Sequence, residues 1–330
     1  MALLSRVYFN AVFGALGGLL GSMLFGVFGE KHASAESAVL FLSYHGLNMV
    51  LGGALIGGVI GYFVVSVEAI RDLSLVKFAR LATYGASLGM IGGALGMLLG
   101  DQVNYWIVGA TQEVSGETGT SGGTLLLTML GRGLGWSLLG MAIGMSEGFA
   151  ARSLGKFSYG TLGGAIGGFV GGVLFQLFYA EAIRAGATDY FWNAMGLVIL
   201  GACIGSLSAL VQAAFQPASV RVLRGWQEGR EYPLEKPASL LGRAEHADIA
   251  LFRDMKIEKQ HATICRVNEQ YLLVNNGAPA EQTRVNDQPI AASIALQDGD
   301  RIQLGNVVMR FQLRAALNRA RAKKSLPAAT

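Results

Sequence analysis

Six stretches of the chain are almost free of charged residues and are long enough to cross a membrane. They lie at residues 7–28, 46–65, 81–100, 125–145, 159–180 and 191–215. A helix needs about 20 apolar residues to cross about 30 Å of hydrocarbon. The whole chain is 52% hydrophobic and only 15% charged, a balance that is unusual for a soluble protein. The sequence therefore predicts a polytopic α-helical membrane bundle of six spans over residues 1–215.

Basic residues alternate between the two sides of these predicted spans. They follow the second, fourth and sixth spans, whereas the other connections are poorer in basic residues and carry acidic ones. By the positive-inside rule, we expect a multi-pass protein of the cytoplasmic (inner) membrane with both termini in the cytoplasm. The basic residues are Arg71, Lys77, Arg80, Arg152, Lys156, Arg221 and Arg224.

The first stretch has a second interpretation, that of a signal peptide. Arg6 precedes it, and Ala33-Ser34-Ala35 resembles a cleavage site. Its apolar run is, however, longer than the roughly 7–15 residues of a signal-peptide core. It also shares a glycine pattern with later spans, so we expect a membrane span.

The predicted spans contain an internal glycine repeat. Segments 14–21, 89–96 and 164–171 read GALGGLLG, GMIGGALG and GAIGGFVG, and the even spans carry glycines four residues apart. This predicts three tandem glycine-rich hairpins around a pseudo-threefold axis. Such glycines let helix backbones approach closely, either within one chain or in a homo-oligomer or pore wall. The predicted packing positions are Gly53, Gly57, Gly140, Gly144, Gly160, Gly164, Gly168, Gly172, Gly201 and Gly205.

Three polar residues occupy equivalent positions toward the predicted outer side. His45, Arg132 and Asn193 each lie eight residues before a repeat glycine. They form either a polar ring at an outer mouth or a set of interfacial side chains that each reach water. A charged residue inside the membrane is the usual pointer to a transport path, and the apolar centres of these spans carry none.

The composition changes after residue 215. Residues 216–313 contain short runs of Val, Ile and Leu between turn signals, a pattern typical of an all-β sandwich or barrel. Residues 314–330 form a basic tail that we expect either to contact anionic lipid or to be solvated. Cys203 and Cys265 lie in different halves and are expected to be buried and unpaired. The predicted strands are 220–224, 231–234, 239–242, 262–267, 270–275, 301–304 and 307–313.

Four ordered blocks in this second half resemble the forkhead-associated (FHA) family. Segment 240–251, LLGRAEHADIAL, resembles the family's "IGR…ADI.L" block, and segment 257–262, IEKQHA, resembles "VSRxHA". Farther along, TRVN at 283–286 resembles "TxVN", and LQDGDRIQLG at 296–305 resembles "L.dGD.I.iG". The resemblance covers about residues 219–313 and implies an FHA-like β-sandwich.

The resemblance also implies a phosphothreonine site. In the family, the arginine of the first block contacts phosphate, the serine of the second adds a contact, the histidine braces the loops, and an Asn or Thr holds the peptide backbone. A guanidinium suits this role because it donates paired, charge-assisted hydrogen bonds to phosphate. Gly242 and His261 are then structural. The candidates for peptide binding are Arg243, Lys259, Asn275, Asn276, Thr283 and Asn286.

Two positions depart from the family pattern. Glu258 replaces the serine, and its carboxylate is expected to repel phosphate or to pair with Arg243. Lys259 is expected either to supply a cation at this position or to form an exposed pair with Glu258. Asn276-Gly277 is followed by alanine, and Thr283 comes only later, so the register of the peptide-holding loop stays open.

The sequence contains no catalytic constellation, P-loop or metal-ligand cluster, so we expect neither an enzyme, a cofactor nor a metal. The net charge of +4 is mild and local, which argues against a nucleic-acid partner. The predicted function is a membrane-anchored recognition or scaffold protein. Its partner is a protein, phosphorylated on threonine or unphosphorylated, or a second copy. The alternative is a channel or transporter formed by the helical repeats and regulated by the FHA-like domain.

Overall fold

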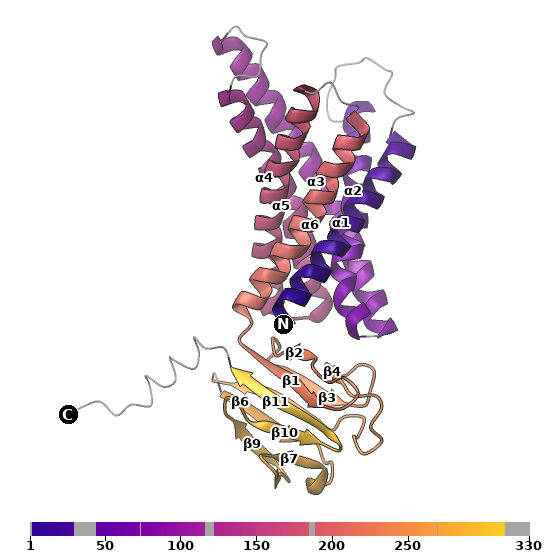
Figure 1. Ribbon diagram of the computed structural model, residues 1–330, viewed down its shortest axis with the longest axis vertical. Helices are drawn as coiled ribbons and strands as arrows, with labels where there is room; N and C mark the ends of the chain where they lie inside the picture. Colours follow the sequence, from indigo (N-terminus) through magenta and orange to yellow (C-terminus); the bar gives the residue numbers. More distant parts are fainter. Residues whose placement is uncertain are drawn as a thin grey trace, which may run out of the picture. The chain divides into compact units, whose positions relative to one another are not determined.

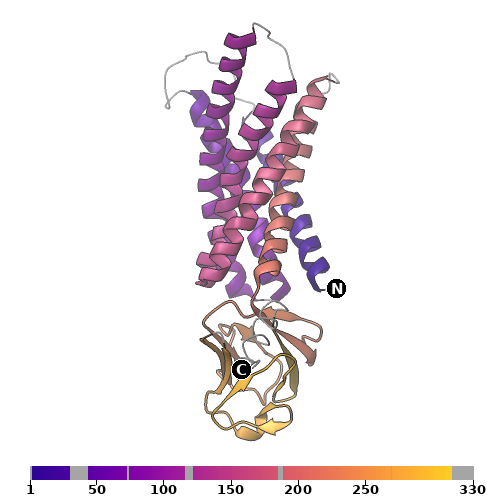
Figure 2. The same cartoon turned by 90° about the vertical axis from the view of Figure 1, so that its left-hand side faces the viewer.

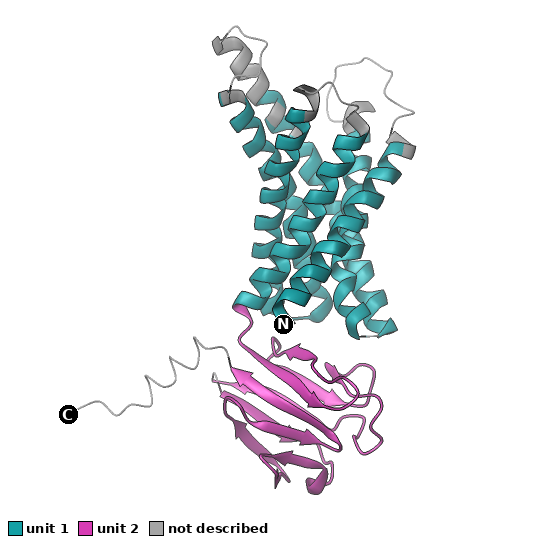
Figure 3. Cartoon of the chain, in the orientation of Figure 1, with its two compact units in different colours: residues 1, 3–214 teal, residues 2, 215–330 magenta. Residues whose placement is uncertain are grey.

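The computed structural model describes residues 2–29, 44–72, 74–115, 122–184, 189–268 and 270–313. The chain divides into two compact units, Leu3–Ala214 and the residues from Phe215 onward (Figure 3). The first unit is helical and the second is built from β-strands (Figure 1). We describe each unit by itself.

Within the described residues, the first unit contains six helices long and apolar enough to cross a membrane. They run side by side along most of their length (Figures 1 and 2). Each predicted span falls mainly within one of them, which confirms the helical part of the predicted fold class. The helices are α1 (Ala2–Gly29), α2 (Tyr44–Asp72), α3 (Leu75–Ser115), α4 (Gly122–Ala151), α5 (Leu154–Arg184) and α6 (Asp189–Phe215).

The connections after α2 and α4 are much shorter than the sequence pattern predicts. Only two residues separate each of these helices from the next. The Ser74 and Ser153 hydroxyls accept the backbone N–H of Lys77 and Lys156, each at 3.3 Å, and thereby cap α3 and α5. The two lysines, predicted to flank the spans, therefore lie in the first helical turns. We call this end of the helical unit the turn end.

Glycine allows close contact between neighbouring helices around the whole unit. A Cβ atom added at Gly201 would collide with the backbone of Gly14, so the last helix packs directly against the first. Together with similar contacts between successive helices, this closes the six helices into a ring. The same collision with a neighbouring helix backbone occurs at each of the other predicted packing positions: Gly53, Gly57, Gly140, Gly144, Gly160, Gly164, Gly168, Gly172 and Gly205. Packing within one chain thus accounts for the glycine pattern.

The second unit is a sandwich of two sheets with orders β2-β1-β11-β10-β7-β8 and β4-β3-β5-β6-β9. Its apolar core includes Tyr271 and Phe311, whose rings lie 5.3 Å apart between centroids. All seven predicted strands are present, and four short ones were not predicted: β4, β7, β8 and β9. The strands are β1 (Ala218–Arg224), β2 (Glu231–Pro233), β3 (Ala238–Gly242), β4 (Ile249–Ala250), β5 (Ala262–Val267), β6 (Gln270–Asn275), β7 (Thr283–Val285), β8 (Gln288–Pro289), β9 (Ser293–Leu296), β10 (Arg301–Leu304) and β11 (Val307–Leu313).

Candidate functional site

Three loops of the sandwich are joined by backbone hydrogen bonds into one surface. They are the loop after β3, the loop between β4 and β5, and the loop between β6 and β7. The Arg243 N–H donates to the carbonyl oxygen of Glu258 at 2.9 Å, and the Ala244 N–H donates to that of Lys259 at 3.2 Å. The Asn276 N–H donates to the His261 carbonyl oxygen at 3.0 Å. The motifs that the sequence places far apart therefore meet at this surface.

Gly242 permits the close crossing of two of these loops. A Cβ atom at this position would collide with the carbonyl groups of Glu258 and Lys259. Gly242 ends β3 and is buried, so the next residue, Arg243, leaves the sheet directly beside the loop before β5. The structural role predicted for this glycine fits its position.

His261 is fully buried and links two loops through both ring nitrogens. Its Nδ1 accepts the backbone N–H of Glu258 at 3.0 Å, and its Nε2 lies 3.0 Å from the hydroxyl of Thr283. Because Nδ1 accepts, the ring proton resides on Nε2, which donates to that hydroxyl. Burial lowers the pKa of the imidazole below its ordinary value and so favours this neutral form.

The Arg243 guanidinium is half-buried and contacts the loop before β5. Its Nε donates to the Ile257 carbonyl oxygen at 3.2 Å, and Nη1 lies 3.5 Å from the sulfur of Met255. A guanidinium has five N–H donors, so three remain for a ligand. The predicted ion pair with Glu258 is absent from the ion pairs between described residues. Glu258 and Lys259 are both exposed.

The other four candidates for peptide binding comprise two exposed residues, Asn276 and Asn286, and two buried ones, Asn275 and Thr283. Asn276 is exposed, and its amide donates to the Thr263 hydroxyl at 2.9 Å. Asn275 is buried and bonds to the backbone of Ala278, whereas Thr283 is the buried partner of the histidine. Asn286 lies in the turn after β7. The burial of Asn275 and Thr283 does not fit the prediction that they contact a peptide. Asn286 is exposed, but it lies outside the three loops and bonds to Asp300 and to the Arg301 N–H.

A second polar cluster, which the sequence analysis missed, lies at the turn end of the helical unit. The Glu68 carboxylate of α2 accepts from Lys77 of α3 at 2.8 Å and from Lys156 of α5 at 2.6 Å. Lys77 also pairs with Asp72. The Glu68 carboxylate of α2 therefore pairs with lysines from two other helices, α3 and α5.

The remaining three helices join this cluster through an amide. Gln212 of α6 donates to the Glu147 carboxylate of α4 at 2.7 Å and accepts from the Arg6 guanidinium of α1 at 2.9 Å. Glu147 and Gln212 are buried. We call the six residues Arg6, Glu68, Lys77, Glu147, Lys156 and Gln212 the turn-end cluster, and every helix of the ring supplies one of them.

A repeated motif in the sequence could have revealed part of this cluster. The pattern Glu-x5-Ser-Leu-x-Lys-Phe occurs at 68–78 and again at 147–157. In each copy the serine caps a helix and the lysine follows three residues later. The lysines were interpreted only as orientation signals, so their acidic partners were overlooked.

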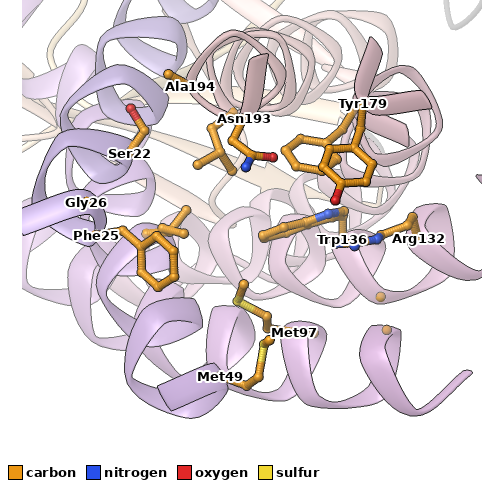
Figure 4. A pocket seen from close by; sticks show the side chains of 16 residues that line it. Ser22, Phe25, Gly26, Met49, Met97, Arg132, Trp136, Tyr179, Asn193 and Ala194 are labelled. Carbon is orange, nitrogen blue, oxygen red and sulfur yellow. The ribbon is translucent and has the colours of Figure 1, made fainter. Parts of the chain in front are cut away.

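The predicted outer polar ring is described only in part. Arg132 and Asn193 line a common cavity at the end of the helices opposite the turn end (Figure 4). His45 belongs to α2, but its side chain is outside the described residues. The cleavage-like segment 33–35 and the basic tail 314–330 are also outside them. Cys203 and Cys265 are free thiols, but both are half-buried and not fully buried as predicted. Within the described part of the chain, no group of three His, Cys, Asp or Glu residues could hold a metal ion.

These features define the class of the protein. It has six apolar helices followed by an all-β sandwich of the FHA type. The sandwich has the two-sheet arrangement, and the glycine, arginine and histidine of the FHA blocks meet at one set of loops.

Comparison with known proteins identifies sequences similar to the sandwich. The family profile described as "Inner membrane component of T3SS, cytoplasmic domain" matches residues 221–315. The transcriptional regulatory protein EmbR of Mycobacterium tuberculosis is 29% identical over 97 residues, which cover 29% of this chain and 24% of EmbR. The chain therefore spans about a quarter of the length of this curated relative.

Solved FHA domains are also similar to the sandwich. The FHA domain of the CT664 protein from Chlamydia trachomatis is 26% identical, and the match covers 30% of this chain and 99% of that chain with a TM-score of 0.28. The FhaA FHA domain, solved with the intracellular domain of Rv3910, is 26% identical, with coverage of 29% and 99% and a TM-score of 0.26.

Proposed function

We propose that this chain is a membrane-anchored interaction protein that recruits a protein partner through its FHA-type domain. The FHA-type fold supports interaction rather than catalysis. The profile match to the cytoplasmic domain of an inner membrane component supports a place in the inner membrane. The basic residues that follow the second, fourth and sixth apolar spans support a cytoplasmic position for both termini and for the sandwich.

The preferred ligand in this proposal is a peptide that carries phosphothreonine. The observation that carries it is the gathering of three polar side chains on one set of bonded loops: Arg243 with three remaining donors, exposed Lys259 and exposed Asn276. Arg243 would hold the phosphate through charge-assisted hydrogen bonds. Lys259 would add a second positive charge, and the Asn276 amide would bond the peptide backbone. The Glu258 carboxylate weakens the site, because it repels phosphate.

Peptide binding to the full chain in lipid nanodiscs tests this proposal. A library of threonine peptides is presented in phosphorylated and unphosphorylated form, and binding is followed by fluorescence anisotropy. We expect preference for the phosphorylated peptides, and we expect Arg243→Ala to abolish that preference. Arg310→Ala is the matched control, because Arg310 is exposed on β11 and belongs to none of the three loops. Equal binding of both peptide forms would show that the ligand is not a phosphopeptide.

A further inference from the structure

Three arginines form a row across the outer face of the six-stranded sheet. Arg310 of β11 lies directly opposite Arg221 of β1 on one side and Arg301 of β10 on the other. These three strands are neighbours in the sheet (Figure 1). Directly opposite residues of antiparallel strands share one face, with Cβ atoms about 5 Å apart. All three side chains are exposed, so the row points away from the apolar core. We call these residues the arginine row.

The positive charges of the arginine row are not neutralised within the sandwich. Within the part of the chain that the structure describes, none of the three guanidinium groups takes part in a hydrogen bond, an ion pair or a ring contact. Like charges directly opposite each other destabilise a sheet. The row is therefore unfavourable for the isolated sandwich, and a bound anion would offset this repulsion.

Two acidic side chains border the row, and both are bonded to other groups. Glu231 of β2 lies opposite Arg221, but its carboxylate accepts the Ser219 hydroxyl at 2.6 Å. Asp300 precedes Arg301, and its carboxylate accepts two hydrogen bonds, at 2.9 and 2.7 Å, from neighbouring turns. These carboxylates offset part of the charge of the row without pairing with it.

The other side chains of β10 and β11 on this face are neutral. Gln303 and Gln312 share the face, because each lies two residues after an arginine of the row. Arg284 of β7 lies opposite Gln303 and adds a fourth positive charge. Its Nε donates to a neutral acceptor, the Glu281 carbonyl oxygen, at 3.1 Å. The face therefore carries an excess of positive charge, which favours an anionic surface as its ligand.

The connection to the helical unit favours a lipid surface over a soluble polyanion. Only Gln216 and Pro217 lie between the end of α6 and the start of β1. Arg221 is the sixth residue after Phe215, the last residue of α6, and six extended residues span at most about 20 Å. The head groups of the membrane that holds α6 are therefore always within reach, at a high effective concentration. A soluble polyanion has no such advantage.

We propose that the arginine row binds the anionic head groups of the membrane that holds the helices. Each guanidinium donates charge-assisted hydrogen bonds to lipid phosphate. This inference rests on the proposed membrane anchoring of the sandwich. It does not rest on the preference for phosphopeptides, because the row lies outside the three loops around Arg243.

Fluorescence quenching on the full chain in nanodiscs tests this proposal. Cys203 and Cys265 are replaced by alanine, and Gln312→Cys carries a bimane fluorophore on the same face as the row. The nanodiscs contain a fixed fraction of phosphatidylcholine with a spin-labelled head group, which quenches a fluorophore at the membrane surface. We expect stronger quenching when phosphatidylglycerol replaces part of the zwitterionic lipid. The gain should disappear at about 1 M salt, where the screening length falls to about 3 Å.

The size of the effect follows from the number of charges removed. Each basic residue near an anionic membrane raises the ratio of docked to free sandwich about fivefold. Arg310→Gln should therefore lower this ratio about fivefold. The triple variant Arg221→Gln, Arg301→Gln and Arg310→Gln should lower it about a hundredfold and remove the response to phosphatidylglycerol. Replacing the same three residues with lysine keeps the charge and should keep the response. Arg266→Gln is the matched control, because Arg266 is exposed on β5 of the other sheet.

Two further measurements separate this proposal from damage to the fold and from failure of the proposed anchoring. A chain that does not co-elute with nanodiscs would contradict the anchoring itself. In zwitterionic nanodiscs, the triple glutamine variant should keep or raise the Tm of the sandwich, because it removes repulsion between like charges. A lower Tm would mean that the arginines serve the fold, and the proposal would be wrong.

The lipid itself decides the remaining outcomes. Quenching that does not respond to phosphatidylglycerol, or a response that survives in the triple glutamine variant, would overturn the proposal. If polyglutamate then binds the wild type but not the triple glutamine variant, the ligand of the row is an acidic protein and not a membrane.

Discussion

Replacing Glu258 with glutamine should strengthen the binding of a phosphothreonine peptide, because it removes the repulsion between the Glu258 carboxylate and the phosphate. The size of the gain can be calculated from that repulsion. The Arg243 N–H donates to the Glu258 carbonyl oxygen at 2.9 Å, so these residues are neighbours across two loops. For the estimate we take a separation of about 7 Å between a phosphate on Arg243 and the exposed Glu258 carboxylate, with water as the medium between them.

The magnitude follows from these two charges. In water, unit charges about 7 Å apart interact by about 0.6 kcal/mol, and a dianionic phosphate doubles this to about 1.2 kcal/mol. Screening leaves about 0.9 kcal/mol at about 0.01 M salt and about 0.5 kcal/mol at about 0.15 M. Glu258→Gln should therefore lower the Kd about fivefold at the low ionic strength and about twofold at the higher one.

Fluorescence anisotropy of a labelled phosphopeptide at both salt concentrations measures this difference on the full chain. Asp287→Asn is the control, because Asp287 is an exposed acidic residue in the turn after β7. Glu258→Ser restores the family's hydroxyl and should add a further gain of about tenfold through a hydrogen bond to phosphate. A gain that does not depend on salt would refute the electrostatic reasoning. Weaker binding of the glutamine variant would mean that Glu258 itself contacts the peptide.

Three further predictions concern stability. Thr283→Val removes the hydroxyl bonded to buried His261 and should lower the free energy of unfolding by about 1–3 kcal/mol. Each kcal/mol lowers the Tm of the sandwich by about 4–8 °C. Calorimetry of the full chain measures this shift, and an unchanged Tm would contradict the prediction. Because burial lowers the pKa of His261 in the folded state, its contribution to stability is complete above about pH 6.5 and is lost as the pH falls below that value. Urea melts should show this slope in the wild type and a smaller one in His261→Gln. Gly164→Ala places a methyl group against the Gly140 carbonyl and should cost about 1–3 kcal/mol, seen as earlier thermal aggregation in detergent. Gly100→Ala, whose Cβ would meet the Gly135 Cα at 3.5 Å, should aggregate like the wild type.

The accuracy of the strand predictions depended on strand length. Strands β5, β6, β10 and β11 have the predicted bounds, because their alternating pattern runs for four to seven residues between clear turn signals. Strands β4 and β8 have two residues each and are too short to show a period. Their extended form depends on pairing with β3 and β7, which local sequence does not encode.

The candidate site was predictable where a motif determines it locally. Gly242, Arg243 and His261 lie together as the family blocks imply. The direction of Asn275 could also have been predicted, since it lies on the same face of β6 as the buried residues Tyr271 and Leu273. The resemblance to the family was given more weight than this period of two, so a buried amide was included among the candidates for peptide binding.

The turn-end cluster was harder to predict, because its partners come from different repeats. Glu68 meets Lys156 across 88 residues, and Gln212 meets Arg6 across 206. The predicted spans stop short of the five charged residues of the cluster, and only Gln212 lies within a predicted span. Only the closure of the six helices into a ring brings the first helix to the last.

This closure has a consequence for the order in which the chain is made. Arg6 is translated first and Glu147 midway, but Gln212, which bonds both, belongs to the last helix to emerge. A chain halted after α5 would lack Gln212, so Arg6 and Glu147 would lose this hydrogen-bond partner in an unclosed bundle. Polar groups without partners are costly in a membrane. Such an unfinished chain would be a natural target for membrane quality control. Because the sandwich follows α6 directly in sequence, its synthesis begins only after that last helix is complete.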